Sequence, residues 1–214
     1  MAADLANHTR ERDSRLSRAL DIVVALAMLI FLLPVMVLVA ASIAITSPGP
    51  IIFKQERMGM NGRTFGCLKF RTMRCDAEQA LSALLAARPE LRYEWASTQK
   101  LAQDPRITGV GSFLRHSSID ELPQLINVLR GEMSLVGPRP IVANEVPRYG
   151  RYITSYFSVR PGLTGLWQVT GRNESSYRRR VAADVLYSRS KSLMFDLKIL
   201  LMTIPAVLSG KGSC

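Results

Sequence analysis

The sequence predicts an α+β, mostly helical fold, in which a membrane-inserted N-terminal helix precedes a domain that faces the cytosol. Three observations predict it: an uncharged apolar run over 22–45, a hairpin turn signal at Asn61-Gly62, and helical spacing of apolar residues in later segments. We therefore divide the 214 residues into an N-terminal arm with its membrane helix, 1–46, and a folded domain, 47–214.

The apolar run contains only two residues that are not apolar, Pro34 and Ser42. As a helix it would be about 36 Å long, which is enough to cross a hydrocarbon core of about 30 Å. A signal peptide would have a shorter apolar core and a clear cleavage site. A buried core helix would carry a polar stripe, which a lone Ser42 does not make. We expect membrane insertion.

Pro34 lies at the middle of the run, and a proline there removes a backbone hydrogen bond and kinks a helix. Basic residues flank the run on both sides, and basic flanks favour the cytoplasmic face. A helix that enters the membrane, bends at Pro34 and returns keeps both flanks inside. We predict this re-entrant form, and a kinked single-pass helix with its N-terminus outside is the alternative.

The first part of the domain reads as a hairpin followed by a helix. Strand-like runs at Ile51–Gln55 and Thr64–Phe70 flank Asn61-Gly62, a dipeptide typical of tight hairpin turns. Apolar residues on one face predict a helix over Asp76–Ala87, which ends before Pro89.

The second part of the domain has one strongly marked helix, Ser118–Arg130, with Gly131 as its natural C-cap. Turn-rich segments rich in Pro and Gly follow it, as a ligand-binding loop or ordinary turn chemistry would require. Leu193–Leu208 is a last amphipathic stretch, too short in its apolar part to span a membrane. It predicts an interfacial helix beside the membrane helix or, equally well, a core helix.

Positive charge belongs to the domain alone. Residues 1–21 carry four basic and four acidic groups, so the net charge of +11 arises from the 24 basic and 13 acidic residues of 46–214. Arginine supplies 22 of the 28 basic residues, and its planar fork binds phosphate bidentately, although genome composition can produce the same bias. Three cysteines, two of them in a basic segment, favour a reduced, cytosol-facing compartment.

The chain contains one pair of adjacent acidic residues, Asp120-Glu121, and none of the GxGxxG, Walker, HExxH, GxSxG or Asp-x-Asp signatures. The pair falls in the first turn of the predicted helix, where a carboxylate should have a low pKa and stay ionised. Such a group suits a nucleophile toward phosphorus or a Mg²⁺ ligand. Ser118-x-x-Glu121 also reads as a capping box in which Asp120 only satisfies the helix dipole, and such a cap does not exclude a site, because the same N-terminus also favours a phosphate.

Five motifs that occur in order carry a resemblance to a known family. They are Lys69-Phe70-Arg71-Thr72-Met73, Arg115-His116-Ser117-Ser118-Ile119-Asp120-Glu121-Leu122-Pro123-Gln124, Val136-Gly137-Pro138-Arg139-Pro140, Arg160-Pro161-Gly162-Leu163-Thr164-Gly165 and Gly171-Arg172-Asn173. Together they resemble the bacterial sugar transferases, the monotopic phosphoglycosyl transferases, from about Arg15 to Leu208. The chain resembles the small catalytic-core form, and most of all the enzymes of galactose- or glucose-phosphate type that initiate exopolysaccharide synthesis.

The resemblance implies an enzyme on the cytoplasmic face of the bacterial inner membrane. It would transfer a hexose-1-phosphate from a UDP-sugar to undecaprenyl phosphate and release UMP. Asp120 would be the nucleophile and form a covalent phosphosugar–aspartate intermediate, while Asp120 and Glu121 would hold Mg²⁺. The substrate-binding residues that the resemblance implies are Lys69, Arg71, Arg115, Arg139, Arg160, Gln168 and Arg172. One departure is Leu33, where a serine commonly precedes the proline, so the bend rests on Pro34 alone.

Two other classes of protein compete with the enzyme. The net charge motivates a nucleic-acid-binding membrane protein, but the chain shows neither a helix-turn-helix signature nor an RNP-type aromatic pair. A membrane scaffold would use the acidic pair only as a cap. We expect the partners to be a UDP-sugar, undecaprenyl phosphate and the bilayer, with no nucleic acid, and a homodimer stays open. No specificity code for the sugar is readable.

Overall fold

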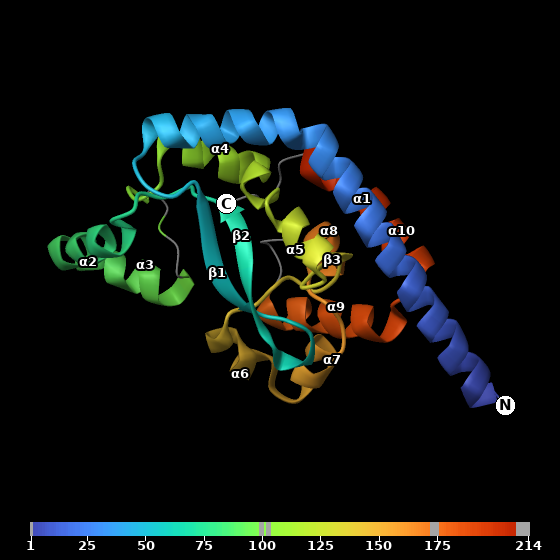
Figure 1. Ribbon diagram of the computed structural model, residues 1–214. Helices are drawn as coiled ribbons and strands as arrows, with labels where there is room; N and C mark the ends of the chain where they lie inside the picture. The colour runs from blue at the N-terminus through green and yellow to red at the C-terminus, as the bar shows by residue number, and fades with distance from the viewer. Residues whose placement is uncertain (1, 99–100, 102–103, 172–175, 209–214) are drawn as a thin grey trace.

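One long N-terminal helix lies along the outside of the molecule (Figure 1). The computed structural model describes residues 2–98, 101, 104–171 and 176–208. Helix α1 runs over Ala2–Thr46 with Pro34 inside it, and its ribbon bends part of the way along. Its segment Arg15–Thr46 is long and apolar enough to cross a membrane.

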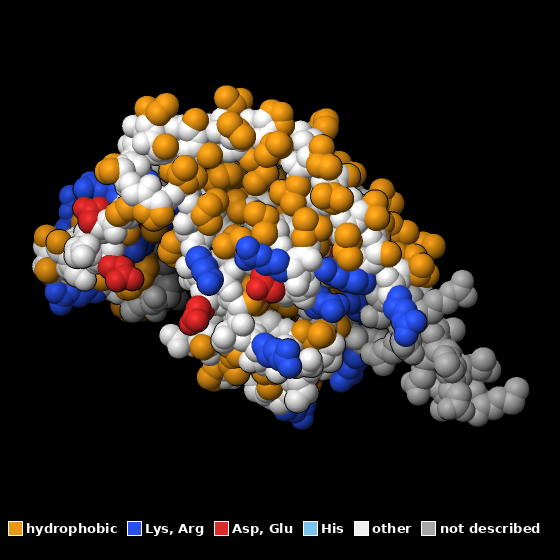
Figure 2. Space-filling view, viewed as in Figure 1, with side chains coloured by type: hydrophobic (Ala, Val, Ile, Leu, Met, Phe, Trp, Pro, Cys, Tyr) orange, Lys and Arg blue, Asp and Glu red, His pale blue; other side chains and the backbone are white. Residues whose placement is uncertain are grey.

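Both halves of α1 pack on the same domain. Ahead of the proline, Ala25 is fully buried in a core cluster with Leu125 and Val128. Beyond it, Ile43 is buried in a second cluster with Leu114. The outward face is apolar and open to solvent, and Figure 2 shows hydrophobic side chains spread along it while charged side chains gather on the domain below. The apolar run is therefore a helix with one docked and one exposed face.

The predicted hairpin is confirmed. Strands β1, Ile52–Met58, and β2, Thr64–Phe70, pair antiparallel with Ile52 opposite Phe70 and Met58 opposite Thr64. The turn passes through the short 3₁₀ helix η1, Met60–Gly62, where Asn61 and Gly62 both have positive φ angles of 59° and 72°. Two consecutive left-handed residues are what a type I′ hairpin turn requires. The first strand extends three residues beyond its predicted end.

Helix α2, Ala77–Ala87, begins one residue after its predicted start, since Asp76 is its N-cap. It is followed by α3, Glu90–Thr98, and by α4, Gly109–Ser117, neither of which was predicted from the sequence. Figure 1 shows α2 and α3 side by side at one end of the molecule, away from β1 and β2.

The prediction of one helix over Ser118–Arg130 is wrong. Ser118 is left-handed (φ 59°), η2 over Ile119–Glu121 is a 3₁₀ turn, and the α-helix α5 starts only at Gln124 and ends at Arg130. Pro123 explains the break, because a proline has no N–H to continue an α-helical ladder through the preceding turn. Gly131 is the left-handed C-cap that the sequence predicts, with φ 80°.

The remaining described elements complete the domain. They are β3 (Ser134–Val136), η3 (Ala143–Glu145), α6 (Val146–Tyr149), η4 (Gly150–Tyr152), α7 (Ile153–Phe157), β4 (Gly162–Thr164), α8 (Leu166–Thr170), α9 (Tyr177–Ser190) and α10 (Leu193–Leu208). Strands β3 and β4 pair in parallel, and their loops pack so closely that a Cβ on Gly162 would lie 2.1 Å from Gly137 N. The glycines of these two motifs thus serve backbone packing.

Helix α10 has one side packed in the core, as the core-helix alternative predicts, and one exposed apolar side. Ile199 and Asp196 are buried on one side, whereas Met194, Leu201 and Ile204 are exposed on the other. Figure 1 shows α10 running behind α1. The mostly helical α+β class is therefore confirmed, with two small sheets instead of a single hairpin.

Candidate active site

The acidic pair lies in the tight turn η2, held between α4 and α5. Asp120 is 7% exposed, and Glu121 keeps about a fifth of its side chain in solvent. The capping-box reading is wrong, because the Ser118 side chain makes no cap hydrogen bond and Glu121 Oε1 instead accepts from Lys69 Nζ at 2.7 Å. Glu121 is therefore held by Lys69 and not by a capping box.

Lys69 of strand β2 joins the pair. Its Nζ lies 2.7 Å from Glu121 Oε1 and 3.6 Å from Asp120 Oδ2. Burial works against ionisation of Glu121, but Lys69 and Arg139 outweigh it and hold the pKa of Glu121 below its ordinary value. Burial raises the pKa of Asp120, although Lys69 and Arg115 oppose that rise. The low pKa that helix position predicts is therefore right for Glu121 and wrong for Asp120, because Asp120 is desolvated.

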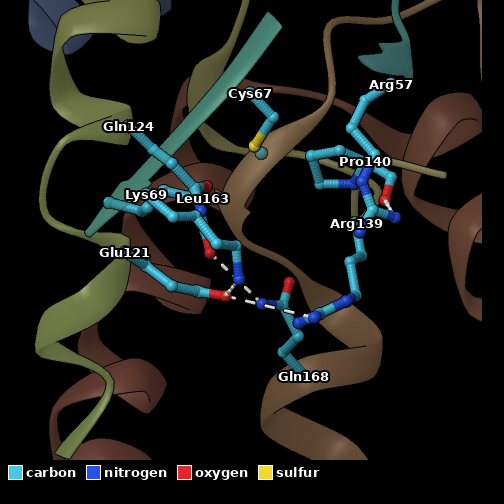
Figure 3. A pocket seen from close by; sticks show the side chains of 10 residues that line it. Arg57, Cys67, Lys69, Glu121, Gln124, Arg139, Pro140, Leu163 and Gln168 are labelled. Atoms are coloured by element: carbon cyan, nitrogen blue, oxygen red, sulfur yellow. Dashed lines mark hydrogen bonds and ion pairs between the residues drawn. The ribbon is translucent and has the colours of Figure 1, made fainter. Parts of the chain in front are cut away.

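A small pocket opens beside this cluster (Figure 3). Its wall is made by the hairpin, the Arg139 loop, the β4 segment and α8. The lining residues are Arg57, Cys67, Lys69, Glu121, Gln124, Arg139, Pro140, Gly162, Leu163 and Gln168. Arg139 Nη2 lies 4.0 Å from Glu121 Oε1, and Figure 3 shows that Arg139 and Gln168 both extend toward that carboxylate. The pocket therefore gathers three of the predicted substrate residues, Lys69, Arg139 and Gln168.

Arg57 and Cys67 are pocket residues that the sequence reasoning missed. The hairpin register pairs Gln55 with Cys67 and Arg57 with Phe65, so the odd-numbered residues of both strands share the face of Lys69. Counting by twos outward from the Asn61-Gly62 turn would have found them. The Arg57 guanidinium donates to Pro140 O at 3.0 Å, which ties the hairpin to the Arg139 loop.

Arg115 lies next to Asp120 but outside the pocket lining. Its Nε donates to Thr72 Oγ1 at 2.9 Å, and its positive charge counteracts the raised pKa of Asp120. A guanidinium beside Asp120 can pair with an anionic group that approaches this carboxylate.

Two of the predicted substrate arginines have structural partners in this structure. Arg71 is buried and donates to the carbonyls of Ser47 and Pro48 at the exit of α1. Arg160 Nε donates to Gly131 O at 2.9 Å, at the C-terminal end of α5. The structure does not bring either side chain into the pocket. Arg172 lies outside the described residues.

The carboxylate pair fits Mg²⁺ only as an ion that a substrate completes. Mg²⁺ is commonly bound by one or two carboxylates together with substrate phosphates. Within the described part of the chain, no cluster of three or more His, Cys, Asp or Glu residues could hold a metal ion on its own. Lys69 would also have to share Glu121 with the cation.

Comparison with known proteins gives the class of this site. The model of the family described as bacterial sugar transferase matches residues 12–210, so the chain belongs to that family and is a transferase. The resemblance in the five motifs is thereby confirmed.

Individual relatives indicate which kinds of sugar transferase this chain is similar to. The exopolysaccharide production protein ExoY of Sinorhizobium fredii is 47% identical, over 92% of this chain and 87% of its own. The undecaprenyl-phosphate galactose phosphotransferase of Salmonella typhimurium is 44% identical over the whole of this chain. A UDP-glucose:undecaprenyl-phosphate glucose-1-phosphate transferase of Caulobacter vibrioides is 42% identical over 90% of it. The chain spans 45% of the length of the Salmonella relative and 69% of the Caulobacter one.

Proposed function

We propose that this protein transfers a hexose-1-phosphate from a UDP-sugar to undecaprenyl phosphate and releases UMP, as the first membrane step of exopolysaccharide or related glycoconjugate synthesis. The observation that carries the proposal is the buried Asp120 carboxylate next to a Lys69-bridged glutamate at the edge of a cationic pocket. Relatives named for galactose- and glucose-phosphate transfer to undecaprenyl phosphate support it.

The reaction proceeds in two displacements at one phosphorus atom. An Asp120 Oδ attacks the β-phosphorus of the UDP-sugar, the bond between that phosphorus and the bridging oxygen breaks, and UMP leaves with the electron pair. A phosphate oxygen of undecaprenyl phosphate then attacks the same phosphorus, and the bond to Asp120 breaks to restore the carboxylate. Two displacements through one covalent intermediate predict ping-pong kinetics.

The side chains around Asp120 divide the work. Lys69 stabilises the ionised carboxylates, because its Nζ lies within 4 Å of both. Arg139 and Gln168 line the pocket and face the leaving nucleotide, while Arg115, which lies beside Asp120 and outside that lining, meets the phosphate of the lipid. Mg²⁺, held by Asp120 and Glu121 with the diphosphate, would neutralise charge on the departing UMP.

The membrane topology that we propose is re-entrant, with the domain on the cytoplasmic face of the inner membrane. Residues on both sides of Pro34 dock on one domain, through Ala25 ahead of it and Ile43 beyond it. A straight span would carry one of these contacts to the opposite side of the bilayer. The exposed apolar face of α1, with Phe31 80% and Ile45 85% exposed, is the surface that lipid would cover.

Trapping the intermediate tests the reaction. The protein is incubated with Mg²⁺ and UDP-galactose or UDP-glucose without lipid acceptor, digested, and examined by mass spectrometry for a hexose phosphate on the peptide that contains Asp120. Asp120→Asn should lose the adduct and lower UMP release about 10³-fold or more while the fold survives. The matched control is Asp76→Asn, an exposed carboxylate paired with Arg74, which should behave as the wild type. Full activity of Asp120→Asn would show that the nucleophile is a different residue.

A further inference from the structure

A buried polar junction joins the membrane helix to the strand that precedes the Arg139 loop. We use this name for Ser17 and Asp21 of α1, Ser134 of β3, Tyr187 of α9 and Asp196 of α10. Each of the five is at most 5% exposed. Ionisable groups at a membrane helix are costly to bury unless they are hydrogen-bonded, so their placement calls for a role.

Asp21 supplies a hydrogen bond that the sheet leaves open. In the β3–β4 pair, Ser134 N donates to Pro161 O, so the N–H of Leu135, the next residue along the strand, points away from β4. Asp21 Oδ1 accepts that N–H at 2.8 Å and also accepts from Ser134 Oγ at 3.1 Å. One carboxylate of the membrane helix thus takes the place of a neighbouring strand on the free edge of β3.

A second branch of the junction reaches the same strand. Ser17 Oγ donates to Asp196 Oδ2 at 2.8 Å. The Tyr187 hydroxyl lies 2.7 Å from Asp196 Oδ1 and 2.9 Å from Val136 O. Helix α1 is therefore connected to β3 in two ways. Asp21 bonds the middle of the strand directly, and Ser17 is linked to its end through Asp196 of α10 and Tyr187 of α9.

Strand β3 runs directly into the segment that carries Arg139. Gly137 follows Val136 and packs against the backbone of Gly162 with no room for a Cβ. Pro138 and Pro140 enclose Arg139 and are both buried. A shift of β3 along its axis is consequently passed on to Arg139, whose Nη2 lies only 4.0 Å from Glu121.

We infer that Asp21 is a positioning residue, which fixes the Arg139 guanidinium at the pocket by hydrogen-bonding the free edge of β3 from the membrane helix. This inference rests on the proposed function for its kinetic consequence. If Asp21 has this role, substrate binding depends on how the N-terminal half of α1 packs on the domain, although Asp21 itself contacts no substrate. The hydrogen-bond acceptor, not the negative charge, is the property that the position requires.

Kinetics of UMP release from UDP-galactose and UDP-glucose test the inference, with Asp21→Ala, Asp21→Asn, Arg139→Ala and the double variant Asp21→Ala/Arg139→Ala. Asp21→Ala should raise the KM for the UDP-sugar about tenfold with a smaller change in kcat, and Arg139→Ala should change the two constants in the same way. Asp21→Asn retains an acceptor oxygen and should restore a KM close to that of the wild type. The double variant should be no worse than Arg139→Ala alone, within about twofold.

Opposite results would overturn the inference: a double variant whose KM equals the product of the two single effects, or an Asp21→Asn as impaired as Asp21→Ala. If Asp21→Ala does not fold, Ser134→Ala removes one partner of Asp21 and should raise the KM in the same direction. Asp76→Ala is the control for loss of an acid elsewhere.

Hydrogen exchange separates this inference from the proposed function. In the wild type the Leu135 amide should be protected, and in Asp21→Ala the peptide spanning 134–139 should exchange at least about tenfold faster. Should the wild type release no UMP from any UDP-sugar, the proposed function fails while the exchange result still tests the junction. Unchanged exchange in Asp21→Ala refutes the coupling even if the enzyme is active.

Discussion

Lys69 determines how the two acidic residues differ. It is closer to Glu121 than to Asp120, by 2.7 Å against 3.6 Å, and this gives the more exposed glutamate the stronger ion pair. Asp120 is left as the more buried and less neutralised carboxylate, with a raised pKa. A partly desolvated carboxylate is a better nucleophile than a solvated one, provided that a neighbouring cation keeps it ionised.

The pH profile of UMP release should report this arrangement. Because Asp120 must be ionised to attack, activity falls as the pH drops through its pKa, and the raised pKa places that fall above the ordinary range of aspartate. Lys69→Met removes the cation that opposes the rise, so the acid limb should move to a higher pH. Single-turnover rates measured from pH 5 to 8 test the shift. Lys54→Met is the control, since Lys54 lies exposed on the other face of the same hairpin and should leave the profile in place.

Among the individual residues of the site, the acidic pair, Lys69 and Arg139 could be predicted from the sequence. Their burial and their contacts could not. The adjacent carboxylates and the helical pattern are local signals. The burial of Asp120 depends on tertiary packing of α4, α5 and β2, which no local pattern carries. Arg71 and Arg160 fit a phosphate by residue type, yet they bond backbone carbonyls at the end of α1 and of α5.

Helix α4 is the element that sets the distance between the acidic turn and the hairpin. It leads directly into Ser118 and η2, and its Gly111 lies against Thr72, which follows strand β2. A Cβ at Gly111 would lie 2.0 Å from Thr72 O, a backbone atom that cannot rotate aside. The contact fixes where α4 can sit, and with it the position of Asp120.

Two substitutions two residues apart on α4 should therefore differ sharply. Gly111→Ala forces α4 away from Thr72 and should lower the free energy of unfolding by about 2 kcal/mol or more. Gly109→Ala meets nothing within 4 Å at the first turn of the same helix and should change it by about 0.5 kcal/mol at most. Denaturant unfolding of both variants in the same detergent measures the difference. Equal stabilities would mean that α4 can shift without cost.

Among the helices and strands, the hairpin could be predicted from the sequence and helix α9 could not. The hairpin follows from one dipeptide with an intrinsic preference for left-handed backbone, so it could be read directly. Helix α9 buries polar groups: Arg180 and Asp184 are 8% and 3% exposed, and burial raises the pKa of Asp184 to about 6 while Tyr149 donates to it. A helix whose buried face carries charge shows no apolar stripe, and the sequence reasoning passed over it.

In the molecule as a whole, helix α1 covers one side of the domain. Because Ala25 and Ile43 contact the same domain from opposite sides of Pro34, the apolar face between them is presented outward as one surface. The length and apolarity of this segment were predictable from the sequence. Its docking at both ends was not, because that docking depends on residues far along the chain.

Cysteine labelling in sealed membrane vesicles tests the re-entrant topology. One variant carries a single cysteine at position 10, and a second keeps only the exposed Cys75, with Cys67 and Cys214 replaced. A membrane-impermeant maleimide should label both from the cytoplasmic side only. Labelling of position 10 from the opposite side alone would establish a single-pass helix instead. The buried Cys67, retained alone, should stay unlabelled from either side and serves as the control.

The bond between Ser17 and Asp196 joins residues 179 positions apart, so the contacts of α1 are completed only by a helix that leaves the ribosome long after it. While the intervening residues are being synthesised, the surface on which α1 docks is incomplete, so the bilayer must cover the apolar face of this helix. Closing so long a loop is slow relative to forming local helices and hairpins. Membrane insertion should therefore come first in the life of the chain, and the domain should reach its native form only after α10 has been translated.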